Sequence, residues 1–441
     1  MPYLLHPSTY RRRGRAFVTL ASVGASLAVI CFFAFPALFA QPPYALDVPA
    51  LPDGDPAVER TRRVAAFEHA PELPDSFEEH TAESAVLIDL EHDAPLYERN
   101  ADTRRAAASL TKLVTMYVIL DELDRGGISL EDRVFPDPRA DWREMPPGSS
   151  LMFLREGEAV TWHELLLGLS VASGNDAAYA AAYELSGSID SFADRMNDAV
   201  AKAGVEELHF TEPSGIAADN EIRAGAFAEF ARHYVERFPE ALAEYHGRES
   251  VTIADENVEF RNRNQLVSDY VGADGLKTGY IPASGYNIVA TAERDGRRLV
   301  SVLLGVEGDS HTEGGRRRES EAAELLDYGF DSFEYAELEP RNAPKVRVPG
   351  AGPVRTRVPP VRIIASSAGD ELHAELNLAS ELRGPFEAGD TIGYVDVIRG
   401  DRRISWQPVY AAEDASVGNG IGGRAAHAAA WWRGVPVGGM D

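Results

Sequence analysis

Two apolar runs joined by a short polar turn limit the fold of this chain more than any other feature. Residues 286–292 and 298–304 flank Arg294-Asp295-Gly296-Arg297. An Asp-Gly pair between apolar runs is a strong signal for a β-hairpin. Both runs are apolar almost without interruption, so we expect strands that are buried on both faces. Such a hairpin needs a layer of structure on each side.

A second hairpin and a series of helices are predicted upstream of this one. Residues 85–90 and 94–98 flank His92-Asp93 in the manner of two paired strands. Apolar periodicity and helix-ending glycines predict helices at 109–123, 162–171, 176–185, 191–203, 227–238 and 319–330. Strands at both ends with helices between them predict a layered α/β domain over residues 81–335.

The rest of the chain divides into segments of different amino-acid composition. Short β-branched runs between Pro and Gly residues predict a small all-β domain at 336–420. Residues 41–80 are acidic and rich in Pro, which is typical of a tether, with one short helix expected near 57–67. Residues 421–441 contain Trp431-Trp432 among alanines and are interpreted as a tail, with a weak membrane contact as the alternative.

The first 40 residues carry the pattern of an export signal. Arg11, Arg12, Arg13 and Arg15 are followed by an uncharged, largely apolar run from 16 to 40. Because the run is also long enough to span a bilayer, a cleaved signal peptide and a retained signal anchor both remain open. The one Cys of the chain, Cys31, lies inside this segment, so neither an intrachain disulfide nor a Cys-based metal site is expected.

The charge of the chain limits the classes of partner that it can bind. The net charge of −27 excludes a general nucleic-acid binder, because phosphate contacts need clustered cations. Lys and Arg together number 43, and only four are Lys: Lys112, Lys202, Lys277 and Lys345. No cluster of His, Asp and Glu at ligand spacing stands out, so we expect no metal and no cofactor.

Two of these lysines belong to three short motifs that occur in order: Ser109-Leu-Thr-Lys112, Ser173-Gly-Asn175 and Lys277-Thr-Gly279. Ser-x-Asn alone carries little weight, because about 0.7 matches are expected by chance, whereas Lys-Thr-Gly is expected about 0.01 times. All three motifs in one order, each at the end of a predicted element, form a far stronger signal.

The residue types suit nucleophilic catalysis. Ser109 and Lys112 are one helical turn apart, so they share a face. A serine hydroxyl needs an adjacent base to take its proton, and burial near a second cation, for which Lys277 is the candidate, would lower the pKa of Lys112 toward that role. A helix beginning at Ser109 directs N–H groups at a developing oxyanion. At the start of a strand, Lys277 and Thr278 could bind a carboxylate, and Gly279 would leave room for substrate backbone.

The chain resembles the penicillin-binding D-alanyl-D-alanine carboxypeptidases of low molecular mass, and the three motifs are those of penicillin-binding proteins and class A β-lactamases. Further family-like blocks occur at residues 107–113, 148–154, 173–178, 262–264, 274–279 and 325–330. The resemblance covers about residues 80–335 and implies a β-lactamase/transpeptidase-like fold. It also implies a periplasmic enzyme, associated with the inner membrane through its N-terminal segment or its tail, that binds peptidoglycan pentapeptides and is acylated by β-lactams.

The resemblance also implies a role for each matching residue. Ser109 is the acylated nucleophile, Lys112 its general base, and Ser173 the proton relay to the leaving D-alanine. The residues that it implies for substrate binding are more numerous: Asn175, Lys277, Thr278, Gly279, Tyr280 through its backbone N–H, and Arg318. The register of Arg318 within 316–318 is open by one or two positions.

The chain departs from the family pattern in three places. Tyr280 stands where some members have His, residues 213–216 replace Pro-His-Gly-Leu, and residues 222–224 replace a helix start that bears Ser or Thr. A β-lactamase is one rival function, but no Glu-x-x-Leu-Asn stretch lies between Asn175 and Lys277. An endopeptidase acting on cross-links and an inactive cell-wall scaffold are two further rival functions.

Overall fold

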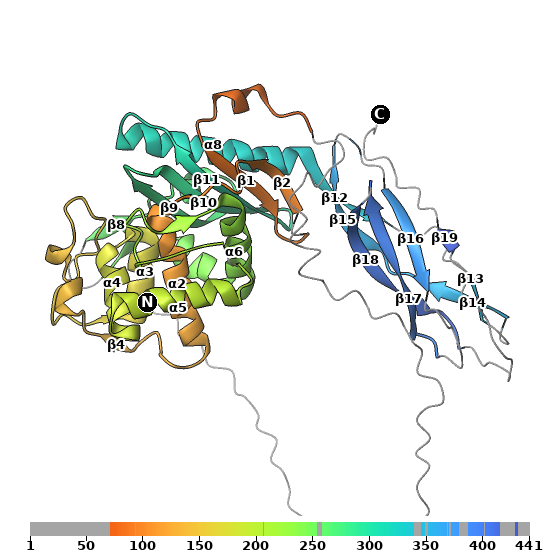
Figure 1. Ribbon diagram of the computed structural model, residues 1–441, viewed down its shortest axis with the longest axis horizontal. Coiled ribbons are helices and arrows are strands. Elements are labelled where there is room, and N and C mark those ends of the chain that lie inside the picture. The colour runs from red at the N-terminus through yellow and green to blue at the C-terminus, as the bar shows by residue number, and fades with distance from the viewer. Residues whose placement is uncertain are drawn as a thin grey trace, which may run out of the picture. The chain divides into compact units, whose positions relative to one another are not determined.

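A five-stranded antiparallel sheet forms the frame of the first part of the fold (Figure 1). The computed structural model describes residues 71–92, 94–205, 207–253, 258–338, 345–348, 352–367, 369, 372–378, 387–400, 402–414 and 428–430. The sheet has the order β2-β1-β11-β10-β9. Its strands are β1 (Ser84–Asp89), β2 (Ala94–Arg99), β9 (Ala273–Ile281), β10 (Gly285–Arg294) and β11 (Arg297–Val306). Both predicted hairpins are confirmed, since β1 pairs with β2 and β10 pairs with β11.

The sheet is buried on both faces, as its apolar runs predicted. Side chains of a strand alternate between the two faces. Val86 and Val289 belong to one apolar core, whereas their neighbours Leu87 and Ile288 belong to another. Helix α8 (His311–Ser332) covers the second face, and helices cover the first (Figure 1). The strand β9 lies at the edge of the sheet, so one of its sides stays open for other contacts.

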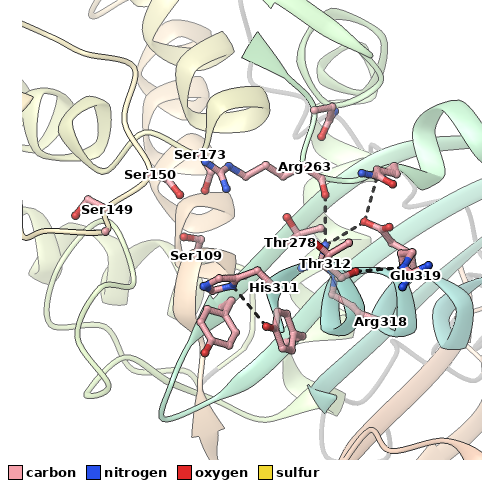
Figure 2. Close-up of a pocket in the computed structure, with 18 residues that line it drawn as sticks. Ser109, Ser149, Ser150, Ser173, Arg263, Thr278, His311, Thr312, Arg318 and Glu319 are labelled. Atoms are coloured by element: carbon pink, nitrogen blue, oxygen red, sulfur yellow. Dashed lines mark hydrogen bonds and ion pairs between the residues drawn. The ribbon is translucent and has the colours of Figure 1, made fainter. Parts of the chain in front are cut away.

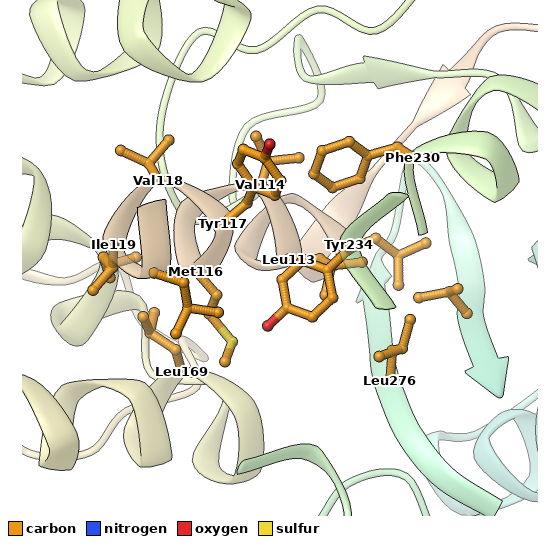
Figure 3. Close-up of a cluster of buried hydrophobic side chains, with 14 of the residues drawn as sticks. Leu113, Val114, Met116, Tyr117, Val118, Ile119, Leu169, Phe230, Tyr234 and Leu276 are labelled. Carbon is orange, nitrogen blue, oxygen red and sulfur yellow. The ribbon is translucent and has the colours of Figure 1, made fainter. Parts of the chain in front are cut away.

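The helix that carries the first motif runs through the centre of one core (Figure 3). Helix α2 (Thr111–Asp124) has ten consecutive buried residues, from Thr111 to Leu120. The sequence predicted one apolar face, but the helix is buried all round. Its polar side chains tolerate this burial because a loop supplies partners: Thr115 donates to the Pro213 carbonyl oxygen at 2.6 Å.

The other helical segments lie between β2 and β9 or beside them. They are η1 (Asp75–Glu79), η2 (Ala108–Leu110), η3 (Pro138–Ala140), η4 (Trp142–Glu144), α3 (Trp162–Leu167), η5 (Gly168–Ala172), α4 (Asn175–Ser186), α5 (Ile189–Lys202), α6 (Ala224–Arg237), η6 (Leu242–His246) and α7 (Leu266–Asp269). Three short strand pairs accompany them: β3 (Arg105–Ala106) with β6 (Glu221–Ile222), β4 (Arg133–Val134) with β5 (Val160–Thr161), and β7 (Ser250–Thr252) with β8 (Glu259–Arg261).

All the predicted helices in the described part of the chain are present, and α8 is longer than expected. It begins at His311 instead of 319, because Ser310 caps it by accepting from the Glu313 N–H. Residues 311–318 are polar and rich in glycine, so they show no apolar periodicity from which this first part of the helix could be predicted. The extension matters because it brings the arginines at 316–318 into a helix.

The second part of the described chain is β-rich, as predicted. Its strands are β12 (Phe333–Leu338), β13 (Lys345–Val348), β14 (Gly352–Arg357), β15 (Val361–Ser366), β16 (Leu372–Leu378), β17 (Thr391–Arg399), β18 (Arg402–Ala411) and β19 (Ala428–Ala430). Six of them form one sheet in the order β13-β14-β18-β17-β16-β19, and β12 pairs with β15. Leu338, Val361, Ile363 and Val397 form a small core there.

The packed structure begins before residue 81. Phe77, in η1, is 2% exposed and packs against Tyr97 and Tyr328. The signal segment 1–40, the short helix expected near 57–67 and most of the tail 421–441 lie outside the described residues. Within the described residues, no helix combines the length and the apolar character needed to cross a bilayer.

Candidate active site

The three motifs meet at one cavity of about 620 Å³ (Figure 2). Ser109, Ser173 and Thr278 line it from η2, the turn after η5, and β9. The sequence therefore predicted correctly which segments come together. Arg316, one of the positions left open for the arginine of 316–318, lines the cavity too. Several further lining residues had no role assigned from the sequence: Gly148, Ser149, Ser150, Arg263, Gln265, Tyr286, His311, Thr312, Gly315 and Glu319.

Lys112 lies beneath Ser109 and is completely buried. Its Nζ donates to Ser109 Oγ at 3.0 Å, to Asn175 Oδ1 at 2.7 Å and to the Ser214 carbonyl oxygen at 2.6 Å. These three acceptors match the three protons of an ammonium group. When the group loses one proton, two donors still serve Asn175 and Ser214, and the lone pair points at the Ser109 hydroxyl. The geometry is thus suited to proton transfer from Ser109 to Lys112.

Burial lowers the pKa of Lys112 to about 7, because desolvation penalises the charged form. The Glu212 carboxylate opposes this shift and raises the pKa, whereas the Arg263 guanidinium lowers it. Lys112 can therefore lose its proton near neutral pH. Lys277 was the neighbouring cation expected from the sequence to lower this pKa, but the cation that does so is Arg263, which lines the cavity.

The second motif is held in a strained backbone conformation. Ser173 has φ 59, in the left-handed region that a residue with a side chain seldom adopts, and it is 1% exposed. Asn175 begins α4, and its N–H donates to the Ser150 carbonyl oxygen at 2.8 Å. Asn175 Oδ1 accepts from Lys112, so the amide links the second motif to the first. Strain of this kind is concentrated at functional sites.

The third motif lies within β9 and not, as predicted, at its start. Lys277 is 1% exposed and donates to the Thr278 carbonyl oxygen at 2.9 Å. Burial lowers its pKa well below the usual value, and the charges of Lys112, Arg263 and Arg318 lower it further. Arg263, Arg316 and Arg318 line the cavity and make it a favourable place for a substrate carboxylate, although the chain as a whole is anionic.

Gly279 lines the cavity and also allows a close backbone contact that was not predicted. A Cβ at this position would lie 2.9 Å from the Ser109 backbone nitrogen and 3.2 Å from that of Leu110. The absence of a side chain therefore lets β9 approach η2. This approach brings the N–H of Ser109 next to the edge strand that carries Tyr280.

The Tyr280 side chain belongs to an aromatic cluster at the wall of the cavity. Its ring stacks on that of Tyr286 with centroids 4.4 Å apart, and His311 packs edge-on against it at 4.7 Å. All three residues line the cavity. An aromatic wall thus occupies the position for which the family resemblance suggested a histidine.

Arg318 is the deepest of the three consecutive arginines. It is 7% exposed, and its Nη2 donates to Glu319 Oε1 at 3.0 Å and to the Arg263 carbonyl oxygen at 3.3 Å. Arg316 also lines the cavity, whereas Arg317 pairs with Glu313. The structure therefore places both Arg318 and Arg316 at the cavity.

Arg263 and Glu212 are charged residues near the site whose part the sequence did not reveal. Arg263 lies in the family-like block 262–264, and its Nε donates to the Ala172 carbonyl oxygen at 3.2 Å, next to Ser173. The Glu212 carboxylate accepts from the N–H and hydroxyl of Ser214, both at 2.7 Å. Ser214 is the residue whose carbonyl holds Lys112. An acid just before a Pro-Ser-Gly turn was the signal that could have identified this loop.

Gly215 is required by the close contact of that loop with the first motif. It has φ +78, and a Cβ there would overlap the Ala108 carbonyl oxygen. We expect Gly215→Ala to lower the free energy of unfolding by about 1–2 kcal/mol through its φ and by about 1–3 kcal/mol more through the overlap. Urea denaturation measures both losses. Gly204→Ala is the matched control, because Gly204 has φ +80 and nothing within 4 Å of the added Cβ. Equal losses in the two variants would contradict the proposed contact.

No group of three or more His, Cys, Asp or Glu side chains arranged to hold a metal ion occurs within the described ranges.

Comparison with known proteins gives a consistent result. The sequence profile described as D-alanyl-D-alanine carboxypeptidase matches residues 68–308, more than half of the chain. The D-alanyl-D-alanine carboxypeptidase DacF of Bacillus subtilis (strain 168) is 29% identical over 76% of this chain and 86% of its own length. DacA of Escherichia coli (strain K12) is 36% identical over 57% of this chain and 62% of its own length. The crystal structure of penicillin binding protein 5 from Haemophilus influenzae has a TM-score of 0.65 at 31% identity and covers 78% of this chain and 99% of that one.

Proposed function

The chain belongs to the D-alanyl-D-alanine carboxypeptidase family, and we propose that its carboxypeptidase reaction proceeds through an acyl-enzyme on Ser109. The chain has the penicillin-binding-protein fold and is a serine-type D-Ala-D-Ala carboxypeptidase that acts on peptidoglycan. The observation that carries the proposal is the hydrogen bond from fully buried Lys112 to Ser109 Oγ.

Acylation begins when neutral Lys112 takes the Ser109 proton and Ser109 Oγ attacks the carbonyl between the two D-alanines. The backbone N–H groups of Ser109 and Tyr280 stabilise the oxyanion, which is consistent with the close approach of η2 to β9. Ser173 relays the proton to the amine of the leaving D-alanine, and Asn175 orients the substrate amide. Water then hydrolyses the ester and regenerates Ser109.

The terminal carboxylate of the substrate is bound by the cationic side of the cavity. Lys277 and Thr278 lie on β9, and Arg318 faces the same cavity from α8. Lys277 has a pKa well below its usual value in the free protein because it is buried among cations. An arriving carboxylate favours its charged form, so substrate binding and protonation of Lys277 support each other.

The rate of acylation is expected to fall as the pH drops below about 7, the pKa of Lys112. Below that pH the base is protonated and cannot accept the Ser109 proton, so the second-order rate constant falls about tenfold per pH unit. Stopped-flow labelling with a fluorescent penicillin between about pH 5 and pH 8 measures this decrease of the rate constant at acid pH. A rate constant that stays flat over this whole range would contradict the role of Lys112 as base.

A carboxypeptidase is favoured over a β-lactamase by the acids that line the cavity. Among the described residues that line it, Glu319 is the one carboxylate, and it accepts from Arg318 and from the Gln265 N–H. A β-lactamase needs a base that activates water against the acyl-enzyme, and a carboxylate paired in this way is poorly suited to that task. A long-lived penicillin adduct is the consequence.

The experiment that tests the proposed function is release of D-alanine from a muropeptide with a pentapeptide stem. The purified chain is expected to release one D-alanine per stem, and prior treatment with penicillin is expected to stop it. No release from the untreated chain would contradict the proposal. Cleavage of cross-linked muropeptides at a comparable rate would favour endopeptidase action.

We also propose that the protein is exported, because its substrate lies in the cell wall and residues 1–40 have the pattern of a signal segment. In a cell with two membranes, this places it in the periplasm.

A further inference from the structure

A second groove, of about 390 Å³, lies next to the catalytic cavity. Its apolar lining is made by Met152, Phe153, Leu154, Ile253, Val258 and Phe260. The polar side chains of Arg133, Arg155 and Glu158 also line it. No step of the proposed reaction uses these residues.

Phe153 presents an aromatic ring to solvent from a strained backbone. It is 41% exposed, and its φ of 65 lies in the left-handed region. The N–H groups on either side of it, those of Met152 and Leu154, both donate to the buried Asp176 carboxylate at 3.0 Å. These bonds hold Phe153 in its strained position. A strained residue with an exposed aromatic side chain points to a binding role.

The ring of Phe153 is part of a small aromatic platform. Trp142 packs edge-on against it with centroids 5.7 Å apart, and Phe260 lies stacked at 6.3 Å with planes 29° apart. Phe260 comes from β8, which lies far along the chain from the 152–154 segment. The platform is thus assembled from separate parts of the chain.

Two chain segments run from the catalytic cavity into the groove. Residues 148–150 line the cavity, and residues 152–155 line the groove. In the same way, residues 262 and 263 line the cavity, and Phe260 lines the groove. The groove and the substrate site therefore adjoin along both segments. A ligand in the groove would lie beside the substrate at Ser109.

We propose that the groove binds the glycan strand to which the stem peptide is attached, so that the enzyme recognises polymeric peptidoglycan. This inference rests on the proposed function, because the stem peptide is the substrate at Ser109. The apolar faces of sugar rings pack on aromatic side chains, and their hydroxyl and acetamido groups find donors and acceptors in Arg133 and Glu158. The groove volume lies within the range of about 300–1,000 Å³ that is usual for small-ligand sites.

The first test compares the same pentapeptide free in solution and linked to a glycan strand of several disaccharide units. The wild-type chain is expected to show a higher kcat/KM for the linked substrate, mainly through a lower KM. Phe153→Ala is expected to reduce the ratio of the two kcat/KM values about three- to tenfold, the effect of losing one aromatic contact. Phe135→Ala is the matched control, because Phe135 is 61% exposed and does not line the groove. An unchanged ratio in Phe153→Ala, or an equal loss in Phe135→Ala, would overturn the proposal.

The second test does not depend on catalysis. Isothermal titration calorimetry with glycan strands stripped of their peptides is expected to detect binding to the wild-type chain. Phe153→Ala is expected to weaken this binding about three- to tenfold. Absence of binding by the wild-type chain would overturn the glycan proposal even if D-alanine release is normal. Conversely, binding without D-alanine release would support the groove while contradicting the carboxypeptidase assignment of the site.

Discussion

Replacing Ser109 by alanine is expected to lower kcat/KM for D-alanine release by at least about 10⁴-fold, because no acyl-enzyme can form without the hydroxyl. The loss is expected in kcat, since the groups that bind the carboxylate, Lys277, Thr278 and Arg318, remain in place. Chromatographic measurement of released D-alanine over several hours gives sufficient range to detect the residual rate. Covalent labelling by penicillin is expected to disappear as well.

Ser149→Ala provides the matched control for this substitution. Ser149 lines the same cavity, but its hydroxyl has no hydrogen-bond partner within the described residues, whereas Ser109 Oγ accepts from Lys112. Its activity is expected to stay within about tenfold of the wild type, since no bond to it is made or broken in the reaction. If Ser149→Ala lost activity and Ser109→Ala kept it, the nucleophile would be assigned wrongly.

Replacing Lys112 by arginine is expected to lower the acylation rate about 10³-fold or more, although the positive charge is kept. The arginine side chain cannot become neutral in a protein, so it cannot accept the Ser109 proton. Its planar group also cannot reproduce the three contacts that Lys112 makes with Ser109, Asn175 and Ser214. Stopped-flow labelling with penicillin measures the rate, and circular dichroism on the same sample establishes that the chain is folded.

Lys202→Arg makes the same chemical change at an exposed position on α5. It is expected to leave both the rate and the melting temperature within error of the wild type. A folded Lys112→Arg chain that acylates at the wild-type rate would show that Lys112 is not the base. The comparison of the two variants is informative because lysine is rare in this chain. Two of the four lysines are those of the first and third motifs, where arginine, the basic residue at most other positions, cannot serve.

The sheet could be predicted from sequence because its signals are local. The hairpins 85–98 and 286–304 each lie within a short stretch, and alternation or continuity of apolar residues follows from burial on one or both faces. The order of the strands was not predictable in this way. The antiparallel pairing of β1 with β11 joins residues that lie far apart in the chain, such as Ser84 and Leu304, and this pairing makes β9 the edge strand beside η2.

The sequence predicted that the three motifs come together at one cavity, but it could not predict the electrostatics around them. Arg263 influences Lys112 only because the fold brings it to the cavity above that lysine, and nothing in the local sequence of either shows this. Glu212 likewise acts through Ser214 and Gly215, which contact the first motif from a distant loop. The close contact at Gly279 could not be predicted either, because it depends on how closely η2 approaches β9 in the fold. Long-range packing decides such features, and a single sequence carries no direct record of it.

The most direct test of Ser109 as the nucleophile is mass spectrometry of the chain after brief exposure to penicillin. The intact mass is expected to increase by one penicillin, to persist for many minutes, and to map on digestion to the peptide that contains Ser109-Leu-Thr-Lys112. The Ser109→Ala chain is expected to stay unmodified under the same conditions. An adduct on another serine, or rapid turnover of penicillin with no adduct, would contradict the assignment of Ser109 as the nucleophile of a D-Ala-D-Ala carboxypeptidase.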